Sequence, residues 1–185
     1  MIAIPAGFTP QEYLSLERQH TVRHEYRRGL VYAMAGGSDD HSSLAVNLVT
    51  EINVHLRGSG CRVLSSDVKV NYAEDFYYYP DVFVTCEPRD DSDRYIKRYP
   101  KMICEVLSTS TQKFDRTEKF NDYKLIDTLE EYVLVSQDQM RVECFRLQPD
   151  KSWQLIAFER GEIATFKSIG LEVCVEELYR GTSVK

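Results

Sequence analysis

Apolar and polar positions along this chain follow two periods, one helical and one typical of strands. A helix is predicted over about residues 10–20, because Thr9, Pro10 and Glu12 form an N-terminal capping pattern. A longer helix is predicted after Ser38, where apolar residues form one stripe at helical spacing: Ala45, Leu48, Val49, Ile52 and Leu56. Both segments are expected to pack one face against a sheet.

Short apolar runs between turn residues predict the strands of that sheet. A hairpin is expected around Arg28-Gly29, with strands at 24–27 and 30–35. The central segment predicts strands at 61–65, 67–72, 79–85 and 101–107, followed by a helix at 112–127. The tail predicts a meander of strands at 132–135, 142–147, 153–158 and 163–166. We therefore expect an α/β (α+β) fold, a curved mixed sheet flanked by helices, in one domain covering residues 1–185.

Composition limits the classes of function. The 43% hydrophobic content, with 8 Phe, 12 Tyr and 1 Trp in 185 residues, is sufficient for one core. The 23 basic and 29 acidic residues give a net charge of −6, which argues against broad electrostatic adhesion to nucleic acid or anionic membranes. Any contact with DNA is therefore expected to be local.

The cysteines and the N-terminal residues predict the cellular compartment of the protein. The five cysteines are odd in number and widely spaced, which favours free thiols in a reducing cytoplasm and offers no paired spacing for zinc. The first residues lack a charged region followed by a long apolar one, and no apolar run approaches about 18 residues. We expect a soluble cytoplasmic protein that is not exported and needs no organic cofactor.

Two acids stand inside apolar strand-like runs. Asp81 follows Pro80 at the start of one run, and Glu105 lies within the other. Burying an unpaired carboxylate costs several kcal/mol, so such acids are usually paired, placed at strand ends or bound to a cation. If the strands are neighbours, both carboxylates present hard oxygen ligands to Mg²⁺ or Mn²⁺, and the Val106 carbonyl is a further candidate ligand.

The helix after the second acid supplies a cation. Asp115, Lys119 and Tyr123 recur at intervals of four and share one helix face. A lysine there is suited to orient an attacking water or to neutralise charge on a transferring phosphate, with Asp115 orienting the lysine. The alternative is a solvated lysine that pairs with Asp115 or Asp122. For Asp81 and Glu105 the alternatives are a turn residue and a buried partner of a nearby cation.

In their order along the chain, these residues resemble the Uma-type restriction endonuclease family of the PD-(D/E)XK nuclease superfamily. The resemblance covers nearly the whole chain and rests on these elements: Pro80-Asp81, Glu105-Val106-Leu107-Ser108, the run 111–120, Tyr123, residues 24–29, Met34, His41 and residues 131–135. It implies a restriction-endonuclease-like fold and metal-dependent cleavage of DNA. The superfamily usually has a lysine two positions after the acid, but this chain has Leu107 at that position. The resemblance implies that Lys119 takes the role of the missing lysine.

The resemblance also places Glu25 and His41 towards the catalytic edge. Glu25 is then a candidate ligand of a second metal or of a water. The alternatives are a cross-strand salt bridge for Glu25 and a helix-start role for His41.

Two segments are candidates for contact with DNA. Four cations occur within eight residues, interleaved with tyrosines: Arg94, Lys97, Arg98 and Lys101. They suit a DNA backbone, although a solvated loop is the alternative. The aromatic run 76–79 suits base stacking, and packing at a sheet edge is the alternative.

The sequence thus favours a Mg²⁺-dependent DNA endonuclease with Asp81, Glu105 and Lys119 as catalytic residues, supported by Glu25, His41, Asp115 and Tyr123. A catalytically silent DNA-binding or dimerisation module of the same fold is the alternative. Cleavage of another bond by an acid pair, such as a glycoside, leaves the lysine helix unexplained. Exposed strands of the C-terminal meander suit pairing across a two-fold axis, so a homodimer is expected.

Overall fold

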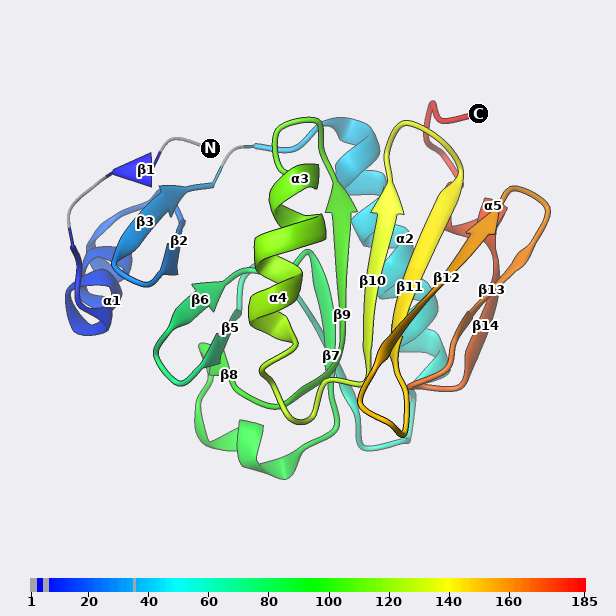
Figure 1. Cartoon of the computed structure of the whole chain (residues 1–185). Coiled ribbons are helices and arrows are strands. Elements are labelled where there is room, and N and C mark those ends of the chain that lie inside the picture. Colours follow the sequence, from blue (N-terminus) through cyan, green and yellow to red (C-terminus); the bar gives the residue numbers. More distant parts are fainter. Residues whose placement is uncertain (1–2, 5–6, 35) are drawn as a thin grey trace.

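Two six-stranded sheets organise the chain within residues 3–4, 7–34 and 36–185, which the computed structural model describes (Figure 1). The N-terminal sheet has the order β1-β3-β2-β6-β5-β8, and the central sheet has the order β12-β11-β10-β9-β7-β4. The strands of the first are β1 Ala3–Ile4, β2 His24–Arg27, β3 Leu30–Ala33, β5 Lys69–Tyr72, β6 Phe76–Tyr78 and β8 Ile96–Lys97. Those of the second are β4 Arg62–Ser65, β7 Val82–Thr85, β9 Pro100–Leu107, β10 Glu131–Ser136, β11 Arg141–Leu147 and β12 Trp153–Glu159. A separate pair consists of β13 Ile163–Phe166 and β14 Leu171–Cys174.

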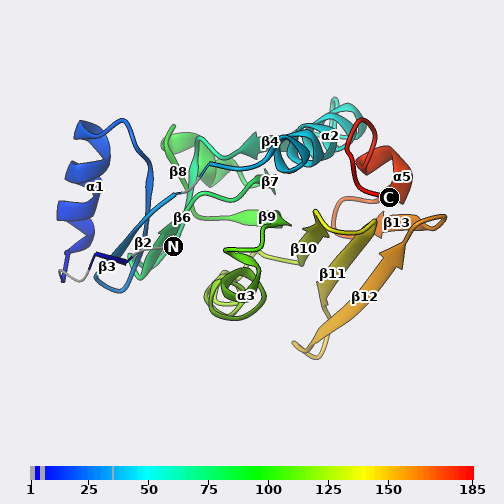
Figure 2. The same cartoon turned by 90° about the horizontal axis from the view of Figure 1, so that it is seen from above.

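Helices cover both faces of the central sheet, as Figure 2 shows for α2 and α3. The helical segments are α1 Pro10–Gln19, α2 Asp39–His55, the 3₁₀ helix η1 Pro88–Ser92, α3 Gln112–Phe114, the π-helix η2 Asp115–Lys119, α4 Phe120–Tyr123 and α5 Val175–Leu178. The capping box at Thr9 and the cap at Ser38 are present, so both predicted N-termini are confirmed. None of the helices within the described ranges is long and apolar enough to cross a membrane.

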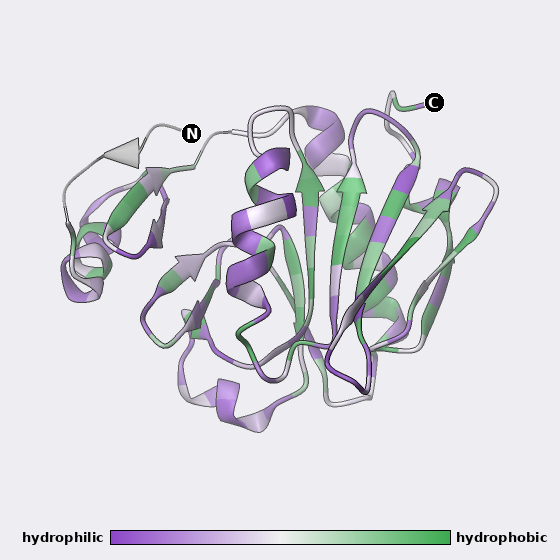
Figure 3. Cartoon of the chain, in the orientation of Figure 1, coloured by the Kyte–Doolittle hydropathy of each residue, from purple (hydrophilic) through white to green (hydrophobic). Residues whose placement is uncertain are grey.

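Two apolar clusters attach these helices to the sheet. Leu44, Leu48 and Ile52 of α2 are buried against one face, and Phe120 and Tyr123 of α4 are buried against the other. The central strands are accordingly rich in hydrophobic residues in Figure 3. Only β9 and β10 pair in parallel within this sheet, and the intervening chain makes the crossover through α3 and α4. This crossover carries Lys119 to the sheet face on which Glu105 lies.

The predicted hairpin and mixed sheet are confirmed. Arg28 and Gly29 have φ values of 47° and 87°, as a two-residue turn between twisted strands requires. The predicted second strand extends to Ala35, which lies outside the described residues.

Three predicted boundaries are wrong. The run expected as a strand from residue 79 pairs only from Val82, because Pro80 has no N–H to donate to a ladder. The third helix ends at Tyr123 instead of 127 and contains the π-helical segment η2. In the tail, β13 leaves the meander and pairs with β14, a strand that the pattern did not reveal.

Cys61 and Cys86 form a disulfide, so the prediction of five free thiols is wrong for these two. Strands β4 and β7 are antiparallel with Arg62 opposite Thr85, which brings the two flanking cysteines together. Cys104 and Cys144 are free and buried, and Cys174 is free and exposed. Because disulfides are rare in reducing compartments, the cysteines no longer support the prediction of a reducing cytoplasm.

Candidate active site

Asp81 and Glu105 lie side by side at one end of the neighbouring strands β7 and β9 of the central sheet. Strands β7 and β9 are antiparallel with Val82 opposite Cys104, so Asp81 lies beside Glu105 and Val106. The Val106 N–H donates to Asp81 Oδ2 at 2.8 Å, and the Asp81 N–H donates to Glu105 Oε2 at 3.3 Å. The structure therefore brings together the pair that the sequence places 24 residues apart.

Lys119 is the cation of this site. Its Nζ lies 2.9 Å from Glu105 Oε1, 3.1 Å from Glu25 Oε1 and 3.8 Å from Asp115 Oδ1. Only 6% of the lysine side chain is exposed, so the alternative of a solvated lysine is wrong. The alternative partner Asp122 instead binds Arg27, whose Nε lies 2.6 Å from Asp122 Oδ2. A buried lysine among three carboxylates is held in a fixed position.

Burial shifts the pKa values of this cluster. Desolvation raises the pKa of Glu105 well above its ordinary value, although the charge of Lys119 opposes this change. Desolvation likewise raises the pKa of Glu25 and of Asp115, again against Lys119. Burial lowers the pKa of Lys119, but the carboxylates outweigh it and the net direction is well upward. The cluster therefore contains one stable ammonium, that of Lys119, and three carboxyl groups, which is more than one ammonium neutralises.

Glu25 reaches the site from the N-terminal sheet. It lies in β2, and its Oε1 accepts the Tyr79 N–H at 2.9 Å besides contacting Lys119. Its ion pair thus joins the two sheets instead of bridging neighbouring strands. Glu25 therefore lies beside Lys119 in the lining of the cavity described below, and its role there stays a prediction.

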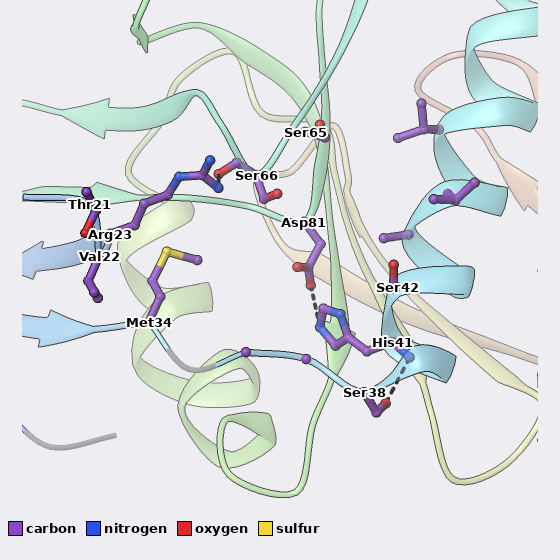
Figure 4. A pocket seen from close by; sticks show the side chains of 15 residues that line it. Thr21, Val22, Arg23, Met34, Ser38, His41, Ser42, Ser65, Ser66 and Asp81 are labelled. Carbon is purple, nitrogen blue, oxygen red and sulfur yellow. Dashed lines mark hydrogen bonds and ion pairs between the residues drawn. The ribbon is translucent and has the colours of Figure 1, made fainter.

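His41 lies in the first turn of α2 and points at Asp81 (Figure 4). Its Nε2 is 3.4 Å from Asp81 Oδ2, and its N–H donates to Ser38 Oγ at 3.1 Å. The contact with Asp81 raises the pKa of His41, against a smaller effect of burial. His41 therefore combines a helix-start position with a direct contact to the predicted metal ligand.

Asp115 and Tyr123 support the cluster from the helical segment. The Tyr123 hydroxyl donates to Glu105 Oε1 at 3.1 Å, and the ring is fully buried. The backbone carbonyl of Asp115 accepts the Tyr132 hydroxyl at 3.0 Å. The π-helical segment still leaves Asp115 and Lys119 within reach of each other. Such segments recur at functional sites.

A cavity of about 400 Å³ opens onto these groups. Glu25, Asp81, Glu105, Lys119 and His41 all line it, so every predicted catalytic side chain faces the same space. Among the residues that the structure describes, no group of three or more His, Cys, Asp and Glu side chains is arranged to hold a metal ion. The predicted set has two carboxylates and one carbonyl, all hard oxygen donors that suit Mg²⁺.

Sequence reasoning missed Gly37 and Gln137. A Cβ on Gly37 would lie 2.9 Å from His41 Nδ1, so the absence of a side chain leaves room for the imidazole. Gln137 lines the cavity, and its Oε1 accepts the Ser38 hydroxyl at 3.0 Å. The glycine pair before the helix cap was a signal in the sequence for Gly37. No local pattern indicates Gln137.

Three of the four cations of the basic segment are engaged within the protein, and contact of this segment with DNA stays a prediction. Lys97 is 3% exposed, and its ammonium donates to the carbonyls of Asp90 and Asp93. Arg98 and Lys101 form ion pairs with Asp93 and Glu130. The segment also follows the far end of β7, away from Asp81.

The aromatic run 76–79 is buried, so the prediction of base stacking is wrong for it. Phe76 stacks on Tyr78 with ring centroids 4.8 Å apart, and both contact Tyr123. The alternative of packing within a sheet is the one observed.

Residues 10–175 match the model of the Uma2 family, described as "Putative restriction endonuclease". The chain belongs to the Uma2 family. The match spans both sheets and includes every residue of the site, which confirms the resemblance seen in the sequence. The description of the family supports a nuclease.

Two cyanobacterial relatives from Synechocystis sp. (strain ATCC 27184 / PCC 6803 / Kazusa) resemble this Uma2 chain along most of its length. "Uncharacterized protein slr1290" is 38% identical over 174 residues, which cover 94% of this chain and 92% of that protein. "Uncharacterized protein sll1609" is 35% identical over 158 residues, which cover 84% and 89%.

A crystal structure from Anabaena variabilis ATCC 29413, described as "a putative nuclease belonging to DUF820", has the same fold. The TM-score is 0.78 with 18% sequence identity, covering 93% of this chain and 97% of that one. The predicted restriction-endonuclease-like fold is confirmed.

Proposed function

We propose that this protein is a metal-dependent DNA endonuclease in which Asp81 and Glu105, with the Val106 carbonyl, hold Mg²⁺ or Mn²⁺ and Lys119 assists phosphodiester hydrolysis. One observation carries the proposal: the Lys119 ammonium lies 2.9 Å from Glu105, and Glu105 in turn contacts Asp81 at the mouth of a cavity. This arrangement joins two hard-oxygen ligands to one fixed positive charge. The Uma2 family and its nuclease description support it.

Each residue has a role that follows from its contacts. When bound, the divalent ion polarises a phosphate oxygen and lowers the pKa of a coordinated water. The buried ammonium of Lys119 stabilises charge that develops on the phosphate, in a site that needs little reorganisation. Tyr123 orients Glu105, and His41 orients Asp81. Hydrolysis forms one bond between water oxygen and phosphorus and breaks one phosphoester bond, and the departing oxygen takes a proton.

The test is a titration of Mg²⁺ and Mn²⁺ into the purified protein with supercoiled and single-stranded DNA as substrates. We expect metal-dependent nicking that is lost in Asp81→Asn and in Lys119→Met. Lys119→Met removes the partner of buried carboxylates, so Asp81→Asn, at a 17% exposed side chain, is the safer variant for folding.

Glu143→Gln is the matched control. Glu143 is also a buried acid, bound by Arg116 and Arg141, but it does not line the cavity. Nicking that survives in Asp81→Asn, or that disappears equally in Glu143→Gln, contradicts the proposed site.

A catalytically silent module is the second candidate, favoured by the state of Glu105. Its Oε1 contacts Lys119 and Tyr123, and its Oε2 accepts the Asp81 N–H. A carboxylate engaged at both oxygens by Lys119, Tyr123 and a backbone N–H is already satisfied without a metal ion. Calorimetric binding of Mg²⁺ with no strand cleavage on any DNA would favour this module over the nuclease.

The predicted homodimer stays a prediction. Strand β12 is the outer strand of the central sheet, and its Leu155 is 48% exposed. Sedimentation velocity of the purified protein measures the oligomeric state directly.

A further inference from the structure

A groove of about 760 Å³ adjoins the catalytic cavity. The groove and the cavity share six lining residues: Met34, Gly36, Gly37, Ser38, His41 and Asp81. Asp81 and His41 therefore stand where the two spaces meet (Figure 4). A substrate with its scissile phosphate at Asp81 would extend directly into the groove.

The walls of the groove combine aliphatic and hydroxyl groups. Helix α2 contributes Ala45, Val46 and Val49, and Val46 is 59% exposed even though it is a large apolar side chain. Hydroxyl groups come from Ser38 and Ser42 at the start of α2, and from Ser65 and Ser66 where β4 ends. A flat apolar ring with hydrogen-bonding edges suits this lining, because its face covers aliphatic carbon while its edge meets hydroxyls.

The groove is poor in cations. Across the described residues that line groove and cavity, the basic side chains are Arg23, His41 and Lys119. Arg23 already forms an ion pair with Asp67 and donates to the Ser66 carbonyl at 3.0 Å, and Lys119 is already assigned to the scissile phosphate. Duplex DNA is held through phosphate contacts on two backbones and a single strand through contacts on one, so a lining with few cations is less unfavourable to a single strand.

We infer that the groove is a subsite for an unpaired nucleotide next to the scissile phosphate, so that the preferred substrate is single-stranded or locally unpaired DNA. The base lies against Val46 and its neighbours on α2, and its edge meets the serine hydroxyls. The inference rests on the proposed nuclease function for the position of the phosphate. It adds a substrate class that the catalytic residues alone do not specify.

The experiment measures fluorescence anisotropy of a labelled single-stranded oligodeoxynucleotide and of its duplex, with the full chain in EDTA and in Mg²⁺. Val46→Arg places a long side chain in the groove, and Val54→Arg is the matched control. Val54 lies on the same helix and is 51% exposed, but it does not line the groove. Arginine is favourable at exposed helix positions, so both variants are expected to fold.

We expect the wild-type protein to bind the single strand at least about tenfold more tightly than the duplex, and Val46→Arg to lose about tenfold in affinity for it, because the long side chain occupies the space of the base. Val54→Arg should bind at least as tightly as wild type. If Val46→Arg instead binds more tightly, as added positive charge alone predicts, the subsite is wrong.

Cleavage assays separate this inference from the proposed function. Single-strand binding that is sensitive to Val46→Arg, without cleavage, overturns the nuclease and retains the subsite. Cleavage of duplex DNA that Val46→Arg leaves unchanged retains the nuclease and overturns the subsite.

Discussion

Two buried acids of the central sheet, Glu131 and Glu105, have opposite electrostatic surroundings. Glu131 is fully buried, and its Oε1 accepts from Arg146 Nε at 2.8 Å while its Oε2 accepts two bonds from Ser168. One arginine and one serine therefore satisfy one carboxylate. The contact between Ser168 and Glu131 holds the segment after β13 against β10.

Around Glu105 the balance is different. Three carboxylates contact one lysine, and Asp81 adds a fourth whose neighbour is the His41 imidazole. Burial raises the pKa of Glu105, Glu25 and Asp115 despite the lysine. Such an excess of buried carboxyl groups does not stabilise the fold, which supports the proposed metal site. Burial of charge alone does not distinguish the two regions, whereas the balance of charge does.

The largest expected effect on stability is at the balanced pair. Glu131→Ala leaves Arg146 with a buried and uncompensated charge, so we expect the free energy of unfolding to fall by about 3–5 kcal/mol. Urea denaturation followed by circular dichroism measures this loss. The double variant Glu131→Met with Arg146→Met should recover most of it, and a single variant as stable as wild type would show that the pair is not structural.

A smaller effect is expected from divalent ions at the unbalanced cluster. Because binding to the folded state stabilises it, Mg²⁺ at a hundredfold excess over its dissociation constant should add about 2.7 kcal/mol to the free energy of unfolding. Thermal unfolding with and without Mg²⁺ detects this as a rise in Tm. Asp81→Asn should abolish the rise, whereas Glu143→Gln should retain it.

The glycine pair before α2 allows a finer test of the same cluster. Gly37→Ala puts a methyl group 2.9 Å from His41 Nδ1, so the imidazole must move away from Asp81, and we expect kcat/KM for DNA cleavage to fall about tenfold. Gly36→Ala meets no atom within 4 Å and is the control. Equal activities of the two variants would mean that the position of His41 does not matter.

The smallest expected effect on stability separates the two acids most directly. Glu105→Gln removes a buried charge from an overcrowded cluster, so we expect the free energy of unfolding to change by less than about 1 kcal/mol or to rise. Its activity should nevertheless fall at least about 100-fold. Chemical denaturation and nicking assays on the same preparation provide both values. A loss of stability as large as that of Glu131→Ala would place Glu105 among the structural pairs.

The sequence by itself determined the local part of this protein. The caps at Thr9 and Ser38, the turn at Arg28-Gly29 and the apolar stripe of α2 are confirmed, because capping, turn geometry and periodicity depend on residues a few positions apart. The ordered motif around Asp81, Glu105 and Lys119 was sufficient to recognise the family. These residues lie in one continuous part of the chain, and their convergence required that β7 pair with β9 and that η2 pack against β9.

Only the tertiary structure decided the long-range part. Glu25 meets Lys119 because two sheets meet at that edge, and Cys61 bonds to Cys86 because β4 pairs with β7. Lys97 is a cation whose burial no local pattern reveals, since loop carbonyls satisfy its ammonium. Burial and pairing partner depend on residues distant in sequence, and these two quantities decide whether a charged residue supports the fold, binds a cation or faces solvent.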